Sequence, residues 1–208
     1  YDRDFRRRIA LKVMLGDPRD PERASRFVQE AQTTAQLEHP NIGPVYDIGV
    51  DARRAPFFTM KWIRGRNFAE VLRAGGEDFT LTRLVQILQQ AAMAVHFAHV
   101  KGVIHRDIKP QNIMVGDFGE VLVVDWGLAK VASRPAGPEA RETKETKGDS
   151  PAPLDLEVST LRAEGGERTL EGSVQGSLPY MAPEQARGEV GEIDARTDVF
   201  GLGAILYE

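Results

Sequence analysis

The 208-residue sequence contains no cysteine. This absence excludes disulfide bonds, thiolate metal sites and cysteine nucleophiles, and it fits a reducing compartment, so we expect a cytoplasmic location. Long hydrophobic runs are also missing, because no apolar stretch approaches the roughly 20 residues with which an α-helix crosses a bilayer. With a net charge of −4 and no basic stripe, the composition argues against a nucleic-acid partner and against an anionic membrane surface.

Aromatic residues are absent from one long segment, since none occurs between Trp126 and Tyr180. Residues 132–172 within this segment are instead rich in Pro, Gly, Ser, Thr and Glu. Such a composition buries too little apolar surface to offset the entropy lost when a chain becomes ordered. We therefore predict a disordered insertion at residues 132–172.

The rest of the sequence predicts alternating strands and helices. Residues 8–15 are typical of a strand, and Asp20-Pro21 begins a helix that ends near Leu37. Two strands are expected at 41–50 and 56–63, and helical spacing of apolar residues continues from 80 to 100. Short strands and polar turns follow, and a last helix is expected to begin near Asp198, with Thr197 or Asp198 as its N-cap.

Three motifs occur in a fixed order along the chain. These are IALK at residues 9–12, HRDIKPQN at 105–112 and APE at 182–184. Together they resemble the catalytic domain of the eukaryotic-type serine/threonine protein kinases, in particular their bacterial branch. The resemblance covers nearly the whole chain outside the insertion.

The resemblance implies a two-lobed α+β fold, with a small β-rich N-lobe at residues 1–63 and a mainly helical C-lobe at 64–208. We expect both lobes to be incomplete. The glycine-rich loop that covers the phosphates in this family should precede Lys12, yet none of the eleven residues before it is glycine. The sequence also stops at Glu208 within an apolar, helix-like pattern, so we expect a fragment. The sequence leaves open a membrane anchor outside it, as many bacterial relatives have.

Phosphoryl transfer needs positioned groups and charge neutralisation more than covalent help from the protein. By the resemblance, Asp107 would act as the catalytic base and Lys109 would place a positive charge near the transferring phosphate. Asn112 would offer its side-chain oxygen to magnesium. Asp198 would brace this catalytic loop from the following helix.

Nucleotide binding is assigned by the same resemblance. Lys12 would pair with the α- and β-phosphates and with a glutamate on the next helix, where Glu30 has the matching place. A lone lysine in an apolar strand is otherwise an edge residue whose charge reaches solvent. Met60 would lie at the back of the nucleotide pocket, with Lys61 and Ile63 in a hinge that binds adenine through its backbone. A buried methionine near a strand end is an equally good interpretation of Met60.

Residues 116–130, GDFGEVLVVDWGLAK, contain two candidate magnesium-binding tripeptides. Asp117 follows Asn112 by five residues, whereas Asp125 follows it by thirteen, which leaves room for two antiparallel strands and a turn at 116–119. The separation of eighteen residues from Asp107 to Asp125 also matches the family. We therefore predict that Asp125 is the magnesium ligand and that Asp117 is a turn residue.

Trp126 replaces the usual Phe, and its N–H needs a partner when buried. His105 is expected to hold Trp126.

The activation segment adds further expectations. Ser177 matches the small hydroxyl residue that approaches the catalytic loop in serine/threonine-specific members. We hypothesise that autophosphorylation at Thr169 or Ser173 orders the segment by pairing with Arg106, the alternative being an unregulated insertion. The basic partner of Glu184 would lie beyond the end of the sequence.

The function implied is that of a protein serine/threonine kinase, which transfers the γ-phosphoryl group of ATP, bound with Mg²⁺, to hydroxyl groups of protein substrates. One alternative is a pseudokinase or scaffold, which would not need Lys12, Glu30, Asp107, Asn112 and Asp125 together. The other is a small-molecule phosphotransferase of related fold, which Lys109 and the APE motif disfavour.

Overall fold

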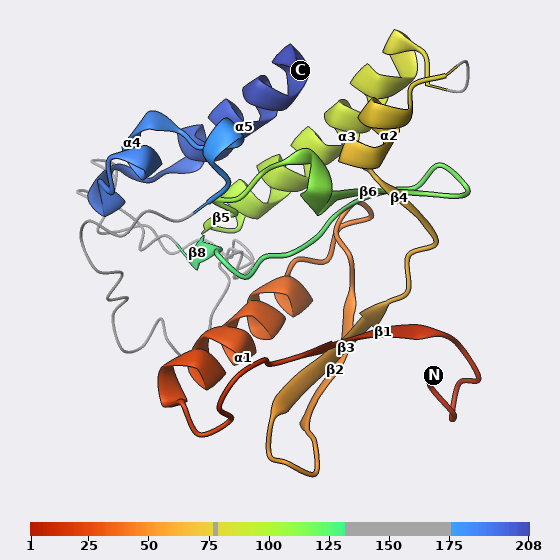
Figure 1. Cartoon of the computed structure of the whole chain (residues 1–208), viewed down its shortest axis with the longest axis vertical. Coiled ribbons are helices and arrows are strands. Elements are labelled where there is room, and N and C mark those ends of the chain that lie inside the picture. The colour runs from red at the N-terminus through yellow and green to blue at the C-terminus, as the bar shows by residue number, and fades with distance from the viewer. Residues whose placement is uncertain (77–78, 132–175) are drawn as a thin grey trace, which may run out of the picture.

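An antiparallel sheet and one helix form the first part of the computed structural model, which describes residues 1–76, 79–131 and 176–208 (Figure 1). The sheet has the strand order β1-β3-β2. Its elements are β1 (Ile9–Val13), α1 (Pro21–Gln36), β2 (Val45–Val50) and β3 (Pro56–Lys61). In β1 and β3, Lys12 pairs with Phe58, so the lysine has a defined position in the sheet.

Helix α1 begins where the sequence predicts, because Asp20 accepts hydrogen bonds from the amides of Glu22 and Arg23 and Pro21 occupies the first turn. The helix packs on the sheet through Phe27, whose ring centroid lies 5.1 Å from that of Phe58. This contact belongs to a small core of buried residues, namely Met14, Phe27, Ala31 and Phe58. The packing places one face of α1 beside Lys12.

The second part is mainly helical and contains two small sheets, with strand orders β4-β6-β7 and β5-β8. Its elements in chain order are β4 (Gly65–Asn67), α2 (Phe68–Ala74), α3 (Leu81–Val100), β5 (Val103–Ile104), β6 (Ile113–Gly116), β7 (Val121–Val123), β8 (Lys130–Val131), α4 (Pro183–Ala186) and α5 (Ala195–Tyr207). Short 3₁₀ helices occupy Pro110–Asn112, Leu178–Tyr180 and Val190–Glu192. Neither β4 nor α2 was predicted from the sequence.

The main core lies between the helices and the β6-β7 hairpin. Figure 1 shows α5 alongside α3, and the two helices are in contact. On α3 the buried residues lie three or four positions from one another along one helical face, and Val95 directly follows Ala94 on that face: Ile87, Ala91, Ala94, Val95 and Ala98. The expected α+β class, with a β-rich part before a mainly helical part, is confirmed.

Strands β1 and β3 end two residues earlier than predicted, and two other predicted boundaries are wrong by a larger margin. Residues 41–44 are not part of β2, because Pro44 has no N–H to donate to a strand ladder and Asn41 and Ile42 instead contact β7. The last helix begins at Ala195 rather than near Asp198, and its N-cap is Asp194, which accepts a hydrogen bond from the amide of Arg196. Neither Thr197 nor Asp198 caps the helix, because both lie inside its first turn.

In the described ranges we find no helix with the length and apolarity that a bilayer crossing requires. The predicted insertion at 132–172 lies outside the described residues.

Candidate active site

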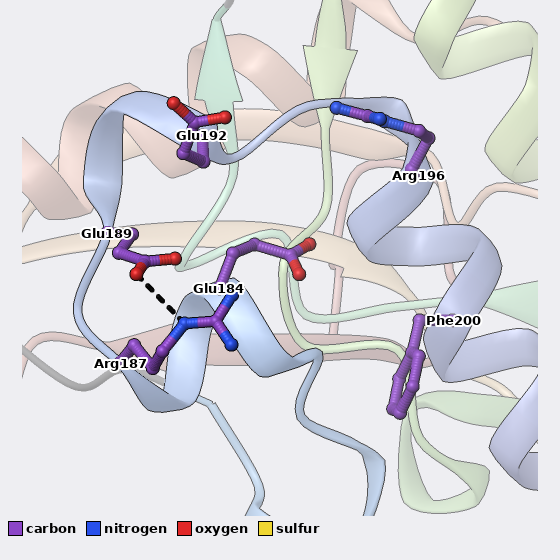
Figure 2. A pocket seen from close by; sticks show the side chains of 6 residues that line it. All are labelled: Glu184, Arg187, Glu189, Glu192, Arg196 and Phe200. Atoms are coloured by element: carbon purple, nitrogen blue, oxygen red, sulfur yellow. Dashed lines mark hydrogen bonds and ion pairs between the residues drawn. The ribbon is translucent and has the colours of Figure 1, made fainter.

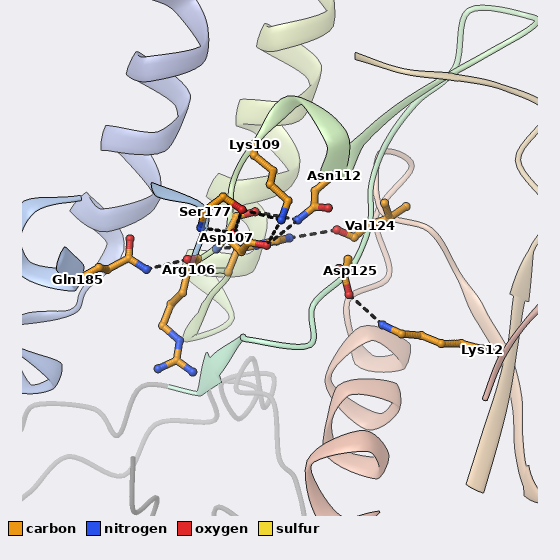
Figure 3. Close-up of polar contacts among 10 residues, drawn as sticks. Lys12, Arg106, Asp107, Lys109, Asn112, Val124, Asp125, Ser177 and Gln185 are labelled. Carbon is orange, nitrogen blue, oxygen red and sulfur yellow. Dashed lines mark hydrogen bonds and ion pairs between the residues drawn. The ribbon is translucent and has the colours of Figure 1, made fainter. Parts of the chain in front are cut away.

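The loop between β5 and β6 gathers the polar residues of the HRDIKPQN motif around one carboxylate. Asp107 is largely buried, and its Oδ2 accepts hydrogen bonds from Lys109 Nζ at 2.6 Å and from Asn112 Nδ2 at 3.2 Å (Figure 3). The 3₁₀ turn at Pro110–Asn112 brings the lysine and the asparagine to the same side of the loop. The structure thus brings together all three residues that the sequence assigned to this loop.

Ser177 joins this cluster from a distant part of the chain. Its backbone N–H and its Oγ both donate to Asp107 Oδ1, each at 3.0 Å. Lys109 Nζ lies 2.8 Å from Ser177 Oγ. The two oxygens of Asp107 therefore face donors from the catalytic loop on one side and from the activation segment on the other, as the resemblance implies for Ser177.

Asp198 holds the backbone of the catalytic loop from α5. Its side chain is 1% exposed and accepts hydrogen bonds at 2.8 Å from the backbone N–H groups of His105 and Arg106. His99 Nε2 lies 2.7 Å from Asp198 Oδ2. The family resemblance implied the bracing role of Asp198, whereas the contribution of His99 was not predicted, because a histidine near a helix end has no distinctive pattern.

Lys12 forms the second polar cluster of the site. Its Nζ lies 2.5 Å from Glu30 Oε1 and 2.8 Å from Asp125 Oδ1. Burial alone would lower the pKa of Lys12, but the two carboxylates raise it. The pKa of Asp125 is lowered, because its interaction with Lys12 outweighs the opposing effect of burial. Burial raises the pKa of Glu30 in spite of the ion pair with Lys12.

The two tripeptides of the segment 116–130 have the places that their spacing predicts. Asp117 and Phe118 form the turn of the β6-β7 hairpin, where Gly119 has φ +85° and Phe118 is 96% exposed. Asp125 follows β7 and returns to Lys12, with φ 66°. The hairpin is confirmed, and it separates Asp117 from the polar clusters.

Trp126 packs beneath the catalytic loop. It is 2% exposed, and its ring centroid lies 4.6 Å from that of His105, as expected. Within the part of the chain that the structure describes, Trp126 Nε1 has no hydrogen-bond partner. Burial lowers the pKa of His105, whose Nε2 lies 3.2 Å from the carbonyl oxygen of Val124. The neutral ring therefore donates to this carbonyl while its Nδ1 accepts from the amide of Asp107.

The donor chemistry at Asn112 and Asp125 fits a hard divalent cation. Asn112 uses its Nδ2 to donate to the carbonyl oxygen of Asp107, so the Oδ1 atom is the one left for a cation. Asp125 is half exposed and carries a carboxylate. Among residues 1–76, 79–131 and 176–208, no group of three His, Cys, Asp or Glu side chains could hold a metal ion. Mg²⁺ commonly takes such oxygen donors from one or two side chains and fills the rest of its shell with phosphate and water.

The residues expected to form the adenine hinge show fewer contacts that point to nucleotide binding than the two polar clusters do. Met60 lies in β3 and packs, partly buried, against the small core of the first part. The backbone N–H of Lys61 donates to the carbonyl oxygen of Pro44 at 3.2 Å, so this amide is engaged within the protein rather than directed toward a base. Ile63 follows the end of β3 and stays a prediction for adenine binding.

Arg106 does not reach into the Asp107 cluster. Its Nε donates to the carbonyl oxygen of Leu128, and Figure 3 shows its guanidinium directed away from Asp107. Thr169 and Ser173 lie outside the described residues, so the phosphate pairing hypothesised for Arg106 is untested.

A pocket of about 660 Å³ lies beside the APE motif (Figure 2). Its lining residues are Glu184, Arg187, Glu189, Glu192, Arg196 and Phe200. Thr197 Oγ1 donates to Glu184 Oε1 at 2.6 Å. The two arginines pair with other carboxylates, Arg187 with Glu189 and Arg196 with Asp194.

Comparison with known proteins agrees with this geometry. A protein kinase domain model matches residues 1–151. Serine/threonine-protein kinase PknD of Protochlamydia amoebophila is 36% identical over 100% of this chain and 21% of its own length. Serine/threonine-protein kinase PknB of Mycobacterium tuberculosis is 35% identical over 99% of this chain and 29% of its own length. The probable serine/threonine-protein kinase SCO3848 of Streptomyces coelicolor is 34% identical over 100% of this chain and 27% of its own length. The chain thus spans less than a third of the length of these relatives.

Proposed function

The chain belongs to the protein kinase family, and from this premise we propose that its protein transfers the γ-phosphoryl group of ATP to serine and threonine hydroxyls of protein substrates. The observation that carries the proposal is the arrangement around Asp107, whose carboxylate contacts Lys109 at 2.6 Å and Ser177 at 3.0 Å. A substrate hydroxyl that approaches Asp107 there meets a carboxylate able to accept its proton and a lysine beside it. The names of the relatives support the same specificity.

In this proposal the residues of the two polar clusters have different tasks. Asp107 orients the attacking hydroxyl and takes up its proton. Lys109 neutralises charge that develops on the transferring phosphoryl group, and its contact with Ser177 keeps the ammonium next to Asp107. Lys12 holds the α- and β-phosphates, while Glu30 fixes the direction of the lysine side chain through their ion pair.

The family implies ATP and a divalent metal, and we propose that the metal is Mg²⁺. Asn112 Oδ1 and the Asp125 carboxylate would hold it. When bound, Mg²⁺ neutralises charge on the phosphate oxygens. The fit rests on hard oxygen donors at both positions and on the small number of protein ligands, which suits a cation that keeps phosphate and water in its shell.

We further propose that residues 1–63 form the smaller lobe and residues 64–208 the larger one. The ion pair from Lys12 in β1 to Asp125 in the second part supports this division, because a site shared between two lobes would need such a link. Modification of Thr169 or Ser173 stays a hypothesis.

Transfer of radiolabelled phosphate from ATP by the full-length protein tests the proposed function. We expect label on serine or threonine of an added protein substrate, and a loss of about a hundredfold or more in Asp107→Asn, since a general base contributes about 10²–10⁴-fold. Asp47→Asn, an exposed site on β2, is the matched control and should transfer label normally. Nucleotide binding without any transfer would show a pseudokinase, and label on an added aminoglycoside but on no protein would show a small-molecule phosphotransferase.

A further inference from the structure

The backbone just before Asp107 adopts an unfavourable conformation. Arg106 has φ 68°, in the left-handed region that residues with a Cβ atom disfavour. Such a conformation persists only where surrounding contacts impose it. Because Arg106 directly precedes Asp107, the contacts that hold its backbone also set the direction of the Asp107 carboxylate.

The peptide bond between Arg106 and Asp107 is held at both ends. Its carbonyl oxygen accepts a hydrogen bond from Gln185 Nε2 at 2.7 Å (Figure 3). Its N–H donates to His105 Nδ1 at 3.2 Å. The preceding amide, that of Arg106, donates to Asp198 at 2.8 Å. Among these partners, Gln185 is the one that follows the APE motif at the end of the activation segment.

The amide group of Gln185 is itself fixed. The side chain is 5% exposed, and its Oε1 accepts a hydrogen bond from the backbone N–H of Ala182 at 3.2 Å, at the start of α4. Gly176 passes close to this contact, because a Cβ atom there would lie 3.4 Å from both Gln185 Nε2 and the Arg106 carbonyl oxygen. The segment that leads into Ser177 therefore runs directly over the hydrogen bond from Gln185 to Arg106.

We propose that Gln185 is a positioning residue that ties the APE motif to the catalytic loop and so fixes Asp107 relative to Ser177. The task needs a side chain that donates at one atom and accepts at another, which a primary amide of this length does. Glutamate at this position would lose the donor, and methionine would lose both functions while keeping a similar length. The inference rests on the proposed kinase function.

Steady-state kinetics of Gln185→Met and Gln185→Glu in the full-length protein test the proposal. We expect kcat to fall about tenfold in Gln185→Met, the effect of losing one buried hydrogen bond that aligns the base, with the KM for ATP unchanged. Gln185→Glu should regain part of its kcat as the pH is lowered from 8 to 6, because a buried, protonated carboxyl can again donate to the Arg106 carbonyl. Gln86→Met, an exposed position on α3, is the control for the substitution itself.

Hydrogen exchange of the Asp107 amide gives a readout that does not depend on activity. Faster exchange in Gln185→Met than in Gln86→Met supports the proposal, even if the protein proves to transfer no phosphate and the proposed function fails. Equal exchange in the two variants overturns it. A loss of activity that only follows the folded fraction, with no change of kcat per folded molecule, also overturns it.

Discussion

Asp117 and Asp125 show how two neighbouring carboxylates come to have different roles. Their side chains are similarly exposed, at 52% and 50%, so burial does not distinguish them. Their partners do: Arg64 Nε lies 3.7 Å from Asp117 at the hairpin tip, whereas Lys12 Nζ lies 2.8 Å from Asp125. The difference arises because the β6-β7 hairpin carries the chain away from the site at Asp117 and returns it at Asp125.

We predict that Asp125→Asn reduces phosphoryl transfer by about a hundredfold or more, since it removes the charge of a proposed metal ligand at the site where transition-state charge would develop. Asparagine tolerates the left-handed backbone at this position, so the fold should be kept. Asp117→Asn is the matched control and should retain activity within about twofold. Initial rates at saturating ATP and Mg²⁺ measure both, and equal losses in the two variants would contradict the assignment.

Because His105 is buried, we predict that the folding stability of the protein depends on pH. Burial lowers its pKa from the usual 6.5, so below pH 6.5 the unfolded chain binds a proton that the folded protein does not. The free energy of unfolding should therefore fall as the pH drops from 6.5, by up to about 1.4 kcal/mol per pH unit, until the folded pKa is reached.

Urea unfolding at pH 7.0 and 5.5 measures this effect. His105→Asn should show a smaller loss of stability between the two pH values than the wild type. His96→Asn removes an exposed histidine of α3 and serves as the control. An identical pH slope in the wild type and His105→Asn would show that this imidazole does not contribute.

At the level of elements, two aspartates at the start of α5 have different roles: Asp194 is the N-cap of the helix, and Asp198 braces the catalytic loop. Asp194 caps the helix and is half exposed, whereas Asp198, one turn later, is buried and faces the catalytic loop. Sequence alone favoured Thr197 or Asp198 as the cap because each residue type suits that position. The position of the helix start depends on which side chain is free to turn back onto the helix, and Asp198 is engaged with His105 and Arg106.

We predict that Asp194→Ala lowers the free energy of unfolding by about 1 kcal/mol, the usual cost of losing an N-cap. Asp198→Ala should cost at least about 3 kcal/mol, because two buried backbone N–H groups lose their acceptor. Urea denaturation of both variants checks the difference. Similar losses would mean that the bracing hydrogen bonds contribute little to stability.

At the level of the whole molecule, Lys12 links three segments that are distant in sequence. It lies in β1, pairs with Glu30 on α1 and reaches Asp125 after β7. A second link is backbone pairing, in which the amide of Val123 donates to the carbonyl oxygen of Asn41 at 2.8 Å. The relative placement of the first and second parts therefore bears directly on the geometry of the proposed nucleotide site.

Glu30→Gln should lower kcat/KM for ATP about tenfold or more, because it removes a charge-assisted hydrogen bond that aligns Lys12. Glu22→Gln, in the exposed first turn of the same helix, is the matched control and should have little effect. A kcat/KM series at fixed Mg²⁺ measures both. If Glu22→Gln were as damaging as Glu30→Gln, the loss would belong to the helix rather than to the ion pair.

The sequence by itself determined the order of the main elements and the hairpin at residues 113–123, because turn residues and apolar spacing act over short distances. The pairing of Lys12 with Glu30 came instead from the resemblance of the motifs to the kinase family. Only the tertiary structure decided that His99 contacts Asp198, that Gln185 contacts the backbone of the catalytic loop and that Asp194 caps α5. Gln185 lies 79 residues from Arg106, and a single polar side chain has no periodic signal. Its partner depends on how α4, α5 and the loop pack together, which no short stretch of sequence encodes.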